Sequence, residues 1–214
     1  MANINVWSKV GVAVQTVLGT AKTITGITKA SPAVATSTSH GFVAGDILLL
    51  KISGMATLDY NVVRVLAAPT ADTFSLEGVD STTFDTFTSG TAQKITFGAN
   101  ASTFQDVSVS GGEAAGIAIN TVHVDQGYEI PGNRSPIVIN MGSLWDPADT
   151  ALLALKGFDD TKTPCAVLLT FATGAKIMFC AYASASLAPT GSSGQAVTTP
   201  VSLRLRGRLT SYAT

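Results

Sequence analysis

The alternation of apolar and polar positions predicts β-strands along most of the chain. Near the start, Val10, Val12 and Val14 alternate with small or polar residues, the period-two pattern of a strand with one buried face. Short apolar runs then follow at residues 33–36, 47–52, 62–66 and 73–76, separated by Gly, Asp, Asn and Pro. This spacing predicts a small all-β module over residues 27–95.

Beyond residue 96 the pattern predicts more strands and one helix. Strands are expected at Phe104–Val109, Ala114–Val124 and Ile137–Asn140. Asp146 is a suitable helix N-cap, with Pro147 at the first helical position and Gly157 after the end. The apolar residues of this segment, Ala151, Leu152 and Leu155, share one stripe, so the helix should pack against a sheet.

The two cysteines belong to a predicted hairpin. Strands Pro164–Ala172 and Ala175–Tyr182 are joined by Thr173 and Gly174, which are suited to a tight turn. In that register Val167 faces Cys180, and Cys165 is a diagonal neighbour of Cys180 at about 7 to 8 Å. This separation is too large for a disulfide. We therefore expect two buried thiols, which fits assembly in a reducing compartment.

The C-terminal part contains a polar loop and a last alternating strand. Residues 183–199 form either a plain surface loop or a long hairpin loop that becomes ordered against a partner subunit. In the strand Val201–Leu209, Arg204, Arg206 and Arg208 alternate with Leu203, Leu205 and Leu209. The arginine face can be a solvated face that protects a sheet edge, a surface that pairs with carboxylates of another subunit such as Asp125 or Glu129, or a phosphate contact.

Composition narrows the function classes. Only 13% of the residues are charged and the formal net charge is −1, whereas globular domains carry about a quarter charged residues. No basic cluster is dense enough to follow a phosphate backbone, which argues against a dedicated nucleic-acid-binding protein. No cationic start followed by a long apolar run occurs, and no stretch of about 18 apolar residues, so we expect neither export nor membrane insertion.

Candidate catalytic or metal-binding chemistry is sparse. His123 stands two residues before Asp125, and Ser110 lies beside two glycines, but residues 108–112 lack the first glycine of a nucleophile elbow. His40 has no second ligand at metal-binding spacing and is interpreted as a turn residue. Trp7 and Trp145 are too few to favour a carbohydrate-binding module. The sequence therefore predicts no catalytic residue, no metal and no cofactor.

The segment between residues 27 and 95 resembles a known compact β module. The resemblance rests on TSHGFVAGD at residues 38–46, SGM at 53–55, LDYNVVRV at 58–65 and DTFSLEGVD at 72–80. The module is common in bacteriophage structural proteins and is similar to the first catalytic-cysteine half-domain of ubiquitin-activating enzymes. No cysteine lies between residues 27 and 95, so the resemblance implies no enzymatic activity.

The whole chain resembles a bacteriophage major tail tube protein. The resemblance rests on MANINVW at the start, SGGE at residues 110–113, NMGSLWD at 140–146 and the order of the predicted elements. It implies a mainly β subunit, a tail-tube-type β-sandwich or barrel of residues 1–26 and 96–214 with one short flanking α-helix. The small all-β module of residues 27–95 is inserted and lies on the outer surface.

The resemblance also implies assembly and partners. Six subunits form a ring, and stacked rings form the virion tail tube, which is assembled in the host cytoplasm and conducts viral DNA during ejection without specific binding. Further partners are the tape measure protein, the tail terminator and baseplate or tail-tip proteins, and no membrane. Candidate inter-subunit residues are Ile4, Val6, Trp7, Pro189, Thr190, Gly191, Arg204, Arg206 and Arg208. Acidic candidates for the lumen wall, which should not hold DNA phosphates, are Asp106, Glu113, Asp125 and Glu129.

Other structural roles remain open from the sequence. A head decoration protein, a baseplate subunit or a tube protein of the type VI secretion kind has a similar pattern. These alternatives differ in polymer form, because a decoration protein does not stack on itself.

Overall fold

The computed structural model describes residues 7–120, 122–123 and 125–213, and about half of them lie in β-strands. The main sheet has ten strands in the order β6-β5-β8-β1-β13-β14-β15-β12-β9, with β2 also pairing with β8. The prediction of a mainly β protein with one α-helix is confirmed. Among the described residues no helix is both long and apolar enough to cross a membrane.

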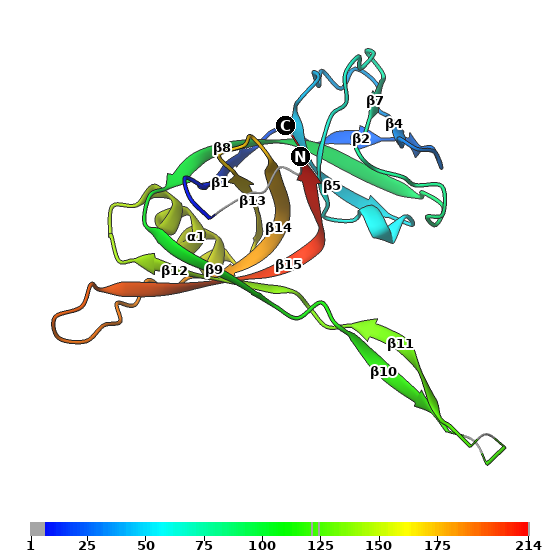
Figure 1. The fold of residues 1–214 in the computed structure, drawn as a ribbon. Coiled ribbons are helices and arrows are strands. Elements are labelled where there is room, and N and C mark those ends of the chain that lie inside the picture. Colours follow the sequence, from blue (N-terminus) through cyan, green and yellow to red (C-terminus); the bar gives the residue numbers. More distant parts are fainter. Residues whose placement is uncertain (1–6, 121, 124, 214) are drawn as a thin grey trace.

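Seven strands of the main sheet curve around helix α1 (Thr150–Thr161) (Figure 1). They are β1 (Gly11–Leu18), β8 (Ser89–Ala101), β9 (Phe104–Ser110), β12 (Val138–Leu144), β13 (Pro164–Thr170), β14 (Lys176–Ser184) and β15 (Thr198–Tyr212). Their inner face and the helix share one apolar core, which contains Val14, Leu152, Leu155, Phe179 and Leu203, all fully buried. We call this unit the body.

A second unit, which we call the module, lies beside the body. It contains β2 (Lys22–Ile24), β3 (Gly26–Ile27), β4 (Val34–Thr36), β5 (Ile47–Ser53), the 3-10 turn η1 (Ala56–Leu58), β6 (Val62–Arg64) and β7 (Thr73–Ser75). The predicted runs at residues 33–36, 47–52, 62–66 and 73–76 thus all form strands. Phe74 and Leu76 lie in a separate apolar cluster, so the module has its own core.

Strand β8 joins the two units. Its first half pairs with β5 and β2 of the module, and its second half pairs with β1 of the body. The boundary predicted at residues 95 and 96 falls inside this continuous strand. A third apolar cluster, with Leu49 and Val62 from the module and Met178 and Cys180 from the body, fills the space between the units. The division into domains stays a prediction.

The predicted helix exists, but it begins and ends later than the sequence indicated. Asp149, not Asp146, is the N-cap: its Oδ1 accepts hydrogen bonds from the backbone N–H groups of Ala151 (2.9 Å) and Leu152 (3.1 Å). Asp146 instead accepts from the N–H of Ala148 in the preceding turn. Gly157 lies inside the helix, and Lys162 caps the C-terminus in the left-handed conformation.

The hairpin of β13 and β14 forms with a different register from the predicted one. Val167 faces Phe179 and Ala166 faces Cys180, one residue away from the predicted pairs. The turn is longer than predicted, because the N–H of Phe171 donates to the carbonyl of Ala175 and leaves three residues in the loop. A shift of one residue reverses the face of every side chain, so the two cysteines point to opposite faces and enter different clusters.

We predict that alanine at position 149 destabilises the fold much more than alanine at position 146. Asp149 is buried, and its Oδ2 also accepts from the hydroxyl of Thr103 (2.9 Å). Asp149→Ala should lower the free energy of unfolding by about 2 kcal/mol, and Asp146→Ala by about 0.5 kcal/mol or less. Urea denaturation of both variants at neutral pH measures the difference, and equal losses would contradict the cap assignment.

The contribution of Asp149 should also depend on pH. Burial raises the pKa of its carboxyl, but the hydrogen bonds from Ser102, Leu152, Thr103 and Ala151 outweigh this effect and leave the pKa below its ordinary value. A lowered pKa in the folded state stabilises the protein fully above the unfolded pKa of about 4 and loses this effect as the pH falls through the folded pKa. The stability gap between wild type and Asp149→Ala should therefore narrow below about pH 4.

Both thiols should be inert in the folded protein. Cys165 and Cys180 are free and buried, and burial raises the pKa of each thiol to about 12, so the reactive thiolate is almost absent. We expect no reaction with Ellman's reagent in mildly alkaline buffer and reaction of two thiols after unfolding in guanidinium chloride. Rapid labelling of the native protein would contradict the buried positions.

Candidate assembly surfaces

A two-stranded hairpin, which we call the arm, projects from the body (Figure 1). It consists of β10 (Ala114–Ile119) and β11 (Tyr128–Arg134), which pair with each other and with no other strand described. Ile117 faces Ile130, and Ile119 faces Tyr128, so these side chains share one face of the ribbon. Ile117, Ile130 and Tyr128 are 49%, 44% and 59% exposed. The arm thus presents an apolar face that nothing in the described chain covers.

The arm leaves the body through a glycine pair. Gly111 and Gly112 have φ angles of +81° and +83°, which side chains rarely adopt. A Cβ atom on Gly111 would also collide with the carbonyl oxygen of Pro136. The strands stay connected at this base, because the N–H of Ser135 donates to the carbonyl of Glu113 (2.9 Å). The glycines thus permit the irregular backbone conformation between β9 and the arm.

Only half of the arm was predicted from the sequence pattern. It predicted one strand from Ala114 to Val124, whereas β10 ends at Ile119, and it predicted no strand where β11 lies. Pro131 and Gly132 inside β11 break the usual strand pattern. The alternation of Tyr128 and Ile130 could have predicted strand β11, because it resembles the alternation of Ile117 and Ile119 in β10.

The acidic candidates divide between the arm and the sheet edge. Glu113, Asp125 and Glu129 lie on the arm, while Asp106 lies on β9. All four are exposed, and the Oδ1 of Asp106 accepts a hydrogen bond from the N–H of Gly142 (2.8 Å). Residues 113–135 carry three carboxylates and a single arginine, so the arm is mainly acidic.

The residues considered for catalysis are not brought together. His123 and Asp125 lie in the turn region at the tip of the arm and not on a strand, whereas Ser110 ends β9 at the base of the arm. His40 is buried, its Nδ1 accepts from the N–H of Phe42, and its ring packs between Phe42 and Phe74. In the described chain no group of His, Cys, Asp or Glu side chains is arranged to hold a metal ion.

The loop between β14 and β15 has the geometry of a long hairpin. Thr190 and Thr198 exchange two backbone hydrogen bonds (2.7 and 2.8 Å), and the indole N–H of Trp145 donates to the carbonyl of Leu187 (3.0 Å). The loop therefore has a fixed base. Its candidate contact residues, Pro189, Thr190 and Gly191, are exposed, and their role between subunits stays a prediction.

The three arginines of β15 differ in their surroundings. Arg204 is exposed, whereas the guanidinium group of Arg206 lies 3.8 Å from the ring centre of Tyr60 and that of Arg208 lies 5.8 Å from that of Phe84. The predicted alternation with leucine holds for Leu203 and Leu205, which pack in the body core. It does not hold for Leu209, which is 44% exposed, so the leucine face of β15 ends at Leu205.

A groove with a mixed apolar and polar lining lies where the first described residues meet β9. It has a volume of about 220 Å³ and its wall includes Trp7, Val12, Phe104 and Val107. Trp7 is 63% exposed and its ring centre lies 5.5 Å from that of Phe171. Strand β9 is also the last strand of the sheet, so its outer edge has no strand partner in the described chain. The candidates Ile4 and Val6 lie outside the described residues.

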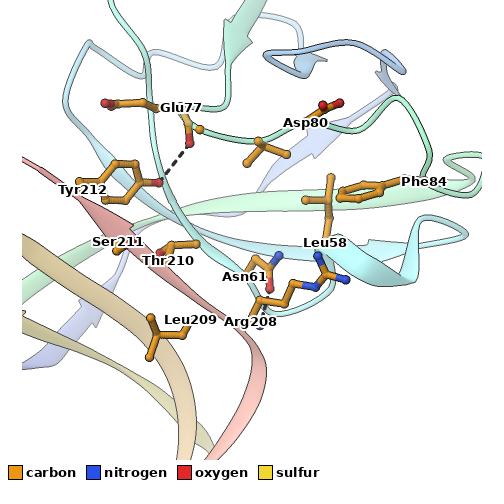
Figure 2. Close-up of a pocket in the computed structure, with 12 residues that line it drawn as sticks. Leu58, Asn61, Glu77, Asp80, Phe84, Arg208, Leu209, Thr210, Ser211 and Tyr212 are labelled. Atoms are coloured by element: carbon orange, nitrogen blue, oxygen red, sulfur yellow. Dashed lines mark hydrogen bonds between the residues drawn. The ribbon is translucent and has the colours of Figure 1, made fainter. Parts of the chain in front are cut away.

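A larger cleft of about 400 Å³ lies between the module and the end of β15 (Figure 2). Asp80 and Phe84 line it from the module, and Arg208 and Tyr212 line it from β15. Hydrogen bonds from the backbone and hydroxyl of Thr82 hold the pKa of Asp80 below its usual range, so the cleft carries both a carboxylate and a guanidinium group.

The comparisons with known proteins agree with this architecture. A family model described as phage tail tube protein, TTP, matches residues 53–214, which include β6 and β7 of the module and most of the body. No curated protein matches the sequence. The family covers most of the chain, and its description agrees with the mainly β fold. The chain therefore belongs to the phage tail tube protein family and is a structural component of the virion tail.

Proposed function

We propose that this subunit forms hexameric rings and that the rings stack into the tube through which viral DNA leaves the virion. The exposed apolar face of the arm is the observation that carries the proposal of self-assembly. An isolated two-stranded hairpin is only marginally stable in water. Ile117, Ile130 and Tyr128 nevertheless lie outside the core and remain open to solvent, as expected for a surface that another copy covers.

If the arm binds a different surface of a neighbouring copy, each copy can bind the next one in the same way. The groove beside Trp7 is a suitable receptor, because Trp7 and Phe104 give it an apolar part that a large side chain such as Tyr128 can contact. Arm and groove are different patches, so their contact is heterologous and produces rings or filaments instead of a closed dimer.

The open edge of β9 supports ring closure within one layer. An unpaired strand edge presents backbone N–H and C=O groups that readily pair with another chain. Six copies joined edge to edge would satisfy these groups and remove the aggregation hazard. The exposed loop at residues 189–191 and Arg204 then remain available for contacts along the tube axis.

The wall of the lumen is proposed to be acidic or neutral, with Asp106, Glu113, Asp125 and Glu129 among its residues. Carboxylates repel DNA phosphates, whereas an arginine-lined bore would hold them in a salt-dependent way. Arg206 and Arg208 support this choice because each lies over an aromatic ring of the same chain. Tail terminator, tape measure and baseplate or tail-tip proteins are the partners expected at the two ends and inside the tube.

The chain is not proposed to be an enzyme. The family is one of structural proteins, and the residues considered for catalysis lie apart at the two ends of the arm. Assembly is therefore the property to measure.

We predict that arm substitutions abolish tube formation without unfolding the subunit. Wild-type protein at rising concentration should give hollow, regularly striated tubes in negative-stain electron microscopy. The double variant Ile117→Ser with Tyr128→Ser should stay in small particles, while its free energy of unfolding changes by about 0.5 kcal/mol or less, because both side chains are exposed.

A matched control separates this effect from a general loss of apolar surface. Val43 is 58% exposed on the module, and Val43→Ser should leave tube formation intact. Tubes formed by the arm variant would contradict the role of the arm but not the proposed function. Discrete particles of wild-type protein at all concentrations would favour a head decoration role over a self-stacking tube.

A further inference from the structure

The end of β15 lies against the module as well as against the body. β15 pairs with β14 up to Arg206, opposite Cys180, and resumes at Thr210, opposite Met178. Four residues of β15 therefore span the length of two residues of β14. Gly207 lies in this bulge with a φ of +89°, and a Cβ atom there would be 2.5 Å from the carbonyl oxygen of Tyr60. The bulge thus brings the strand close to the module backbone.

Within and after the bulge, Arg208, Thr210 and Tyr212 of β15 each form a hydrogen bond with the module. The N–H of Arg208 donates to the Oδ1 of Asn61 (2.7 Å), and the hydroxyl of Thr210 donates to the carbonyl of Val62 (2.7 Å). The buried hydroxyl of Tyr212 accepts from the N–H of Arg64 (3.0 Å). These three contacts place the end of β15 along β6 and Asn61 just before it.

Tyr212 makes a further contact that fixes the turn after β7. Its hydroxyl donates to the carbonyl of Glu77 (3.3 Å) while it accepts from Arg64, and Figure 2 shows the bond to Glu77. The side chain of Arg64 lies 4.6 Å over the Tyr212 ring and pairs with the Glu77 carboxylate. One phenol thus connects two segments of the module to the last strand.

Cation–π and apolar contacts complete the junction. The Arg206 guanidinium lies 3.8 Å from the ring centre of Tyr60 in the module and hydrogen-bonds the hydroxyl of Tyr182 in the body. Beneath it, Val62 of the module packs in one cluster with Met178 of the body. Buried contacts of this kind exclude water and strengthen the polar interactions beside them.

We propose that residues 206–212 act as a clasp that holds the module in one fixed orientation on the body. Strand β8 already joins the two units through its backbone, but a single strand pair permits twisting and bending. The clasp adds a second connection between the module and the body, formed by the C-terminal strand β15. The module is thus held at two places instead of one. The module therefore turns with the body as one rigid unit. This inference concerns the single subunit and does not depend on ring formation.

A distance measurement across the junction tests the clasp. Spin labels at Ala67→Cys in the module and Leu153→Cys on helix α1 are both on exposed positions, and the two native cysteines are buried and should not react. Double electron–electron resonance on the full chain should give one narrow distance distribution. The same pair in a chain carrying Thr210→Val and Tyr212→Phe should give a distribution at least about twofold broader.

The control is Ser211→Ala, which lies between the two altered positions on an exposed site and should keep the narrow distribution. A narrow distribution in the Thr210→Val and Tyr212→Phe chain would show that β8 alone fixes the module and would overturn the proposal. A broad distribution in the chain with a native clasp would also overturn it.

Hydrogen exchange covers the case in which the distance variant is poorly folded. In the single variant Tyr212→Phe, peptides covering residues 58–66 and 72–80 should exchange about tenfold faster, while peptides covering α1 and β12 keep their wild-type rates. Equal acceleration in all peptides would indicate a global loss of stability and would contradict a local clasp.

Discussion

Backbone pairing along β8 is the constraint on which the rest of the structure depends. This strand supplies hydrogen bonds to the module through β2 and β5 and to the body through β1. Its 13 residues extend for about 43 Å at 3.3 Å per residue. One continuous strand therefore takes part in both units. Strand β8 also contributes Ile95 to the apolar cluster that the two units share, and the contacts of β15 with the module add a second connection.

The subunit combines two well-packed cores with surfaces that are open to solvent. A protein with few charged residues tends to associate or aggregate when apolar side chains are exposed on its surface. The apolar face of the arm lies away from both cores, and carboxylates lie near it. The exposed apolar surface is thus separate from the folded body. The low charge of the chain and the exposed apolar face of the arm therefore both favour association between copies of the subunit.

The pattern of residues predicted most strands and the helix correctly. It did not predict the exact position of the helix N-cap or the register of the β13–β14 hairpin. Asp146 and Asp149 are both acceptable caps in sequence, and the choice between them depends on how Leu152 packs in the core. The turn near Gly174 differs by one residue from the predicted turn, which is enough to exchange the faces of β14. The position of Arg206 over Tyr60 required the tertiary structure, because the two residues are far apart in the sequence.

Strand β15 and the loop that precedes it have very different tolerance to changes of length. Between Thr198 and Arg206 each residue pairs with β12, with β14 or with both, so an inserted residue would reverse the faces of all positions beyond it. Residues 191–197, which the Thr190 and Thr198 pair encloses, lie in no strand, so no strand register depends on their number. Natural variation in chain length, and any inserted peptide tag, should therefore accumulate at residues 191–197 and not in the strand that follows.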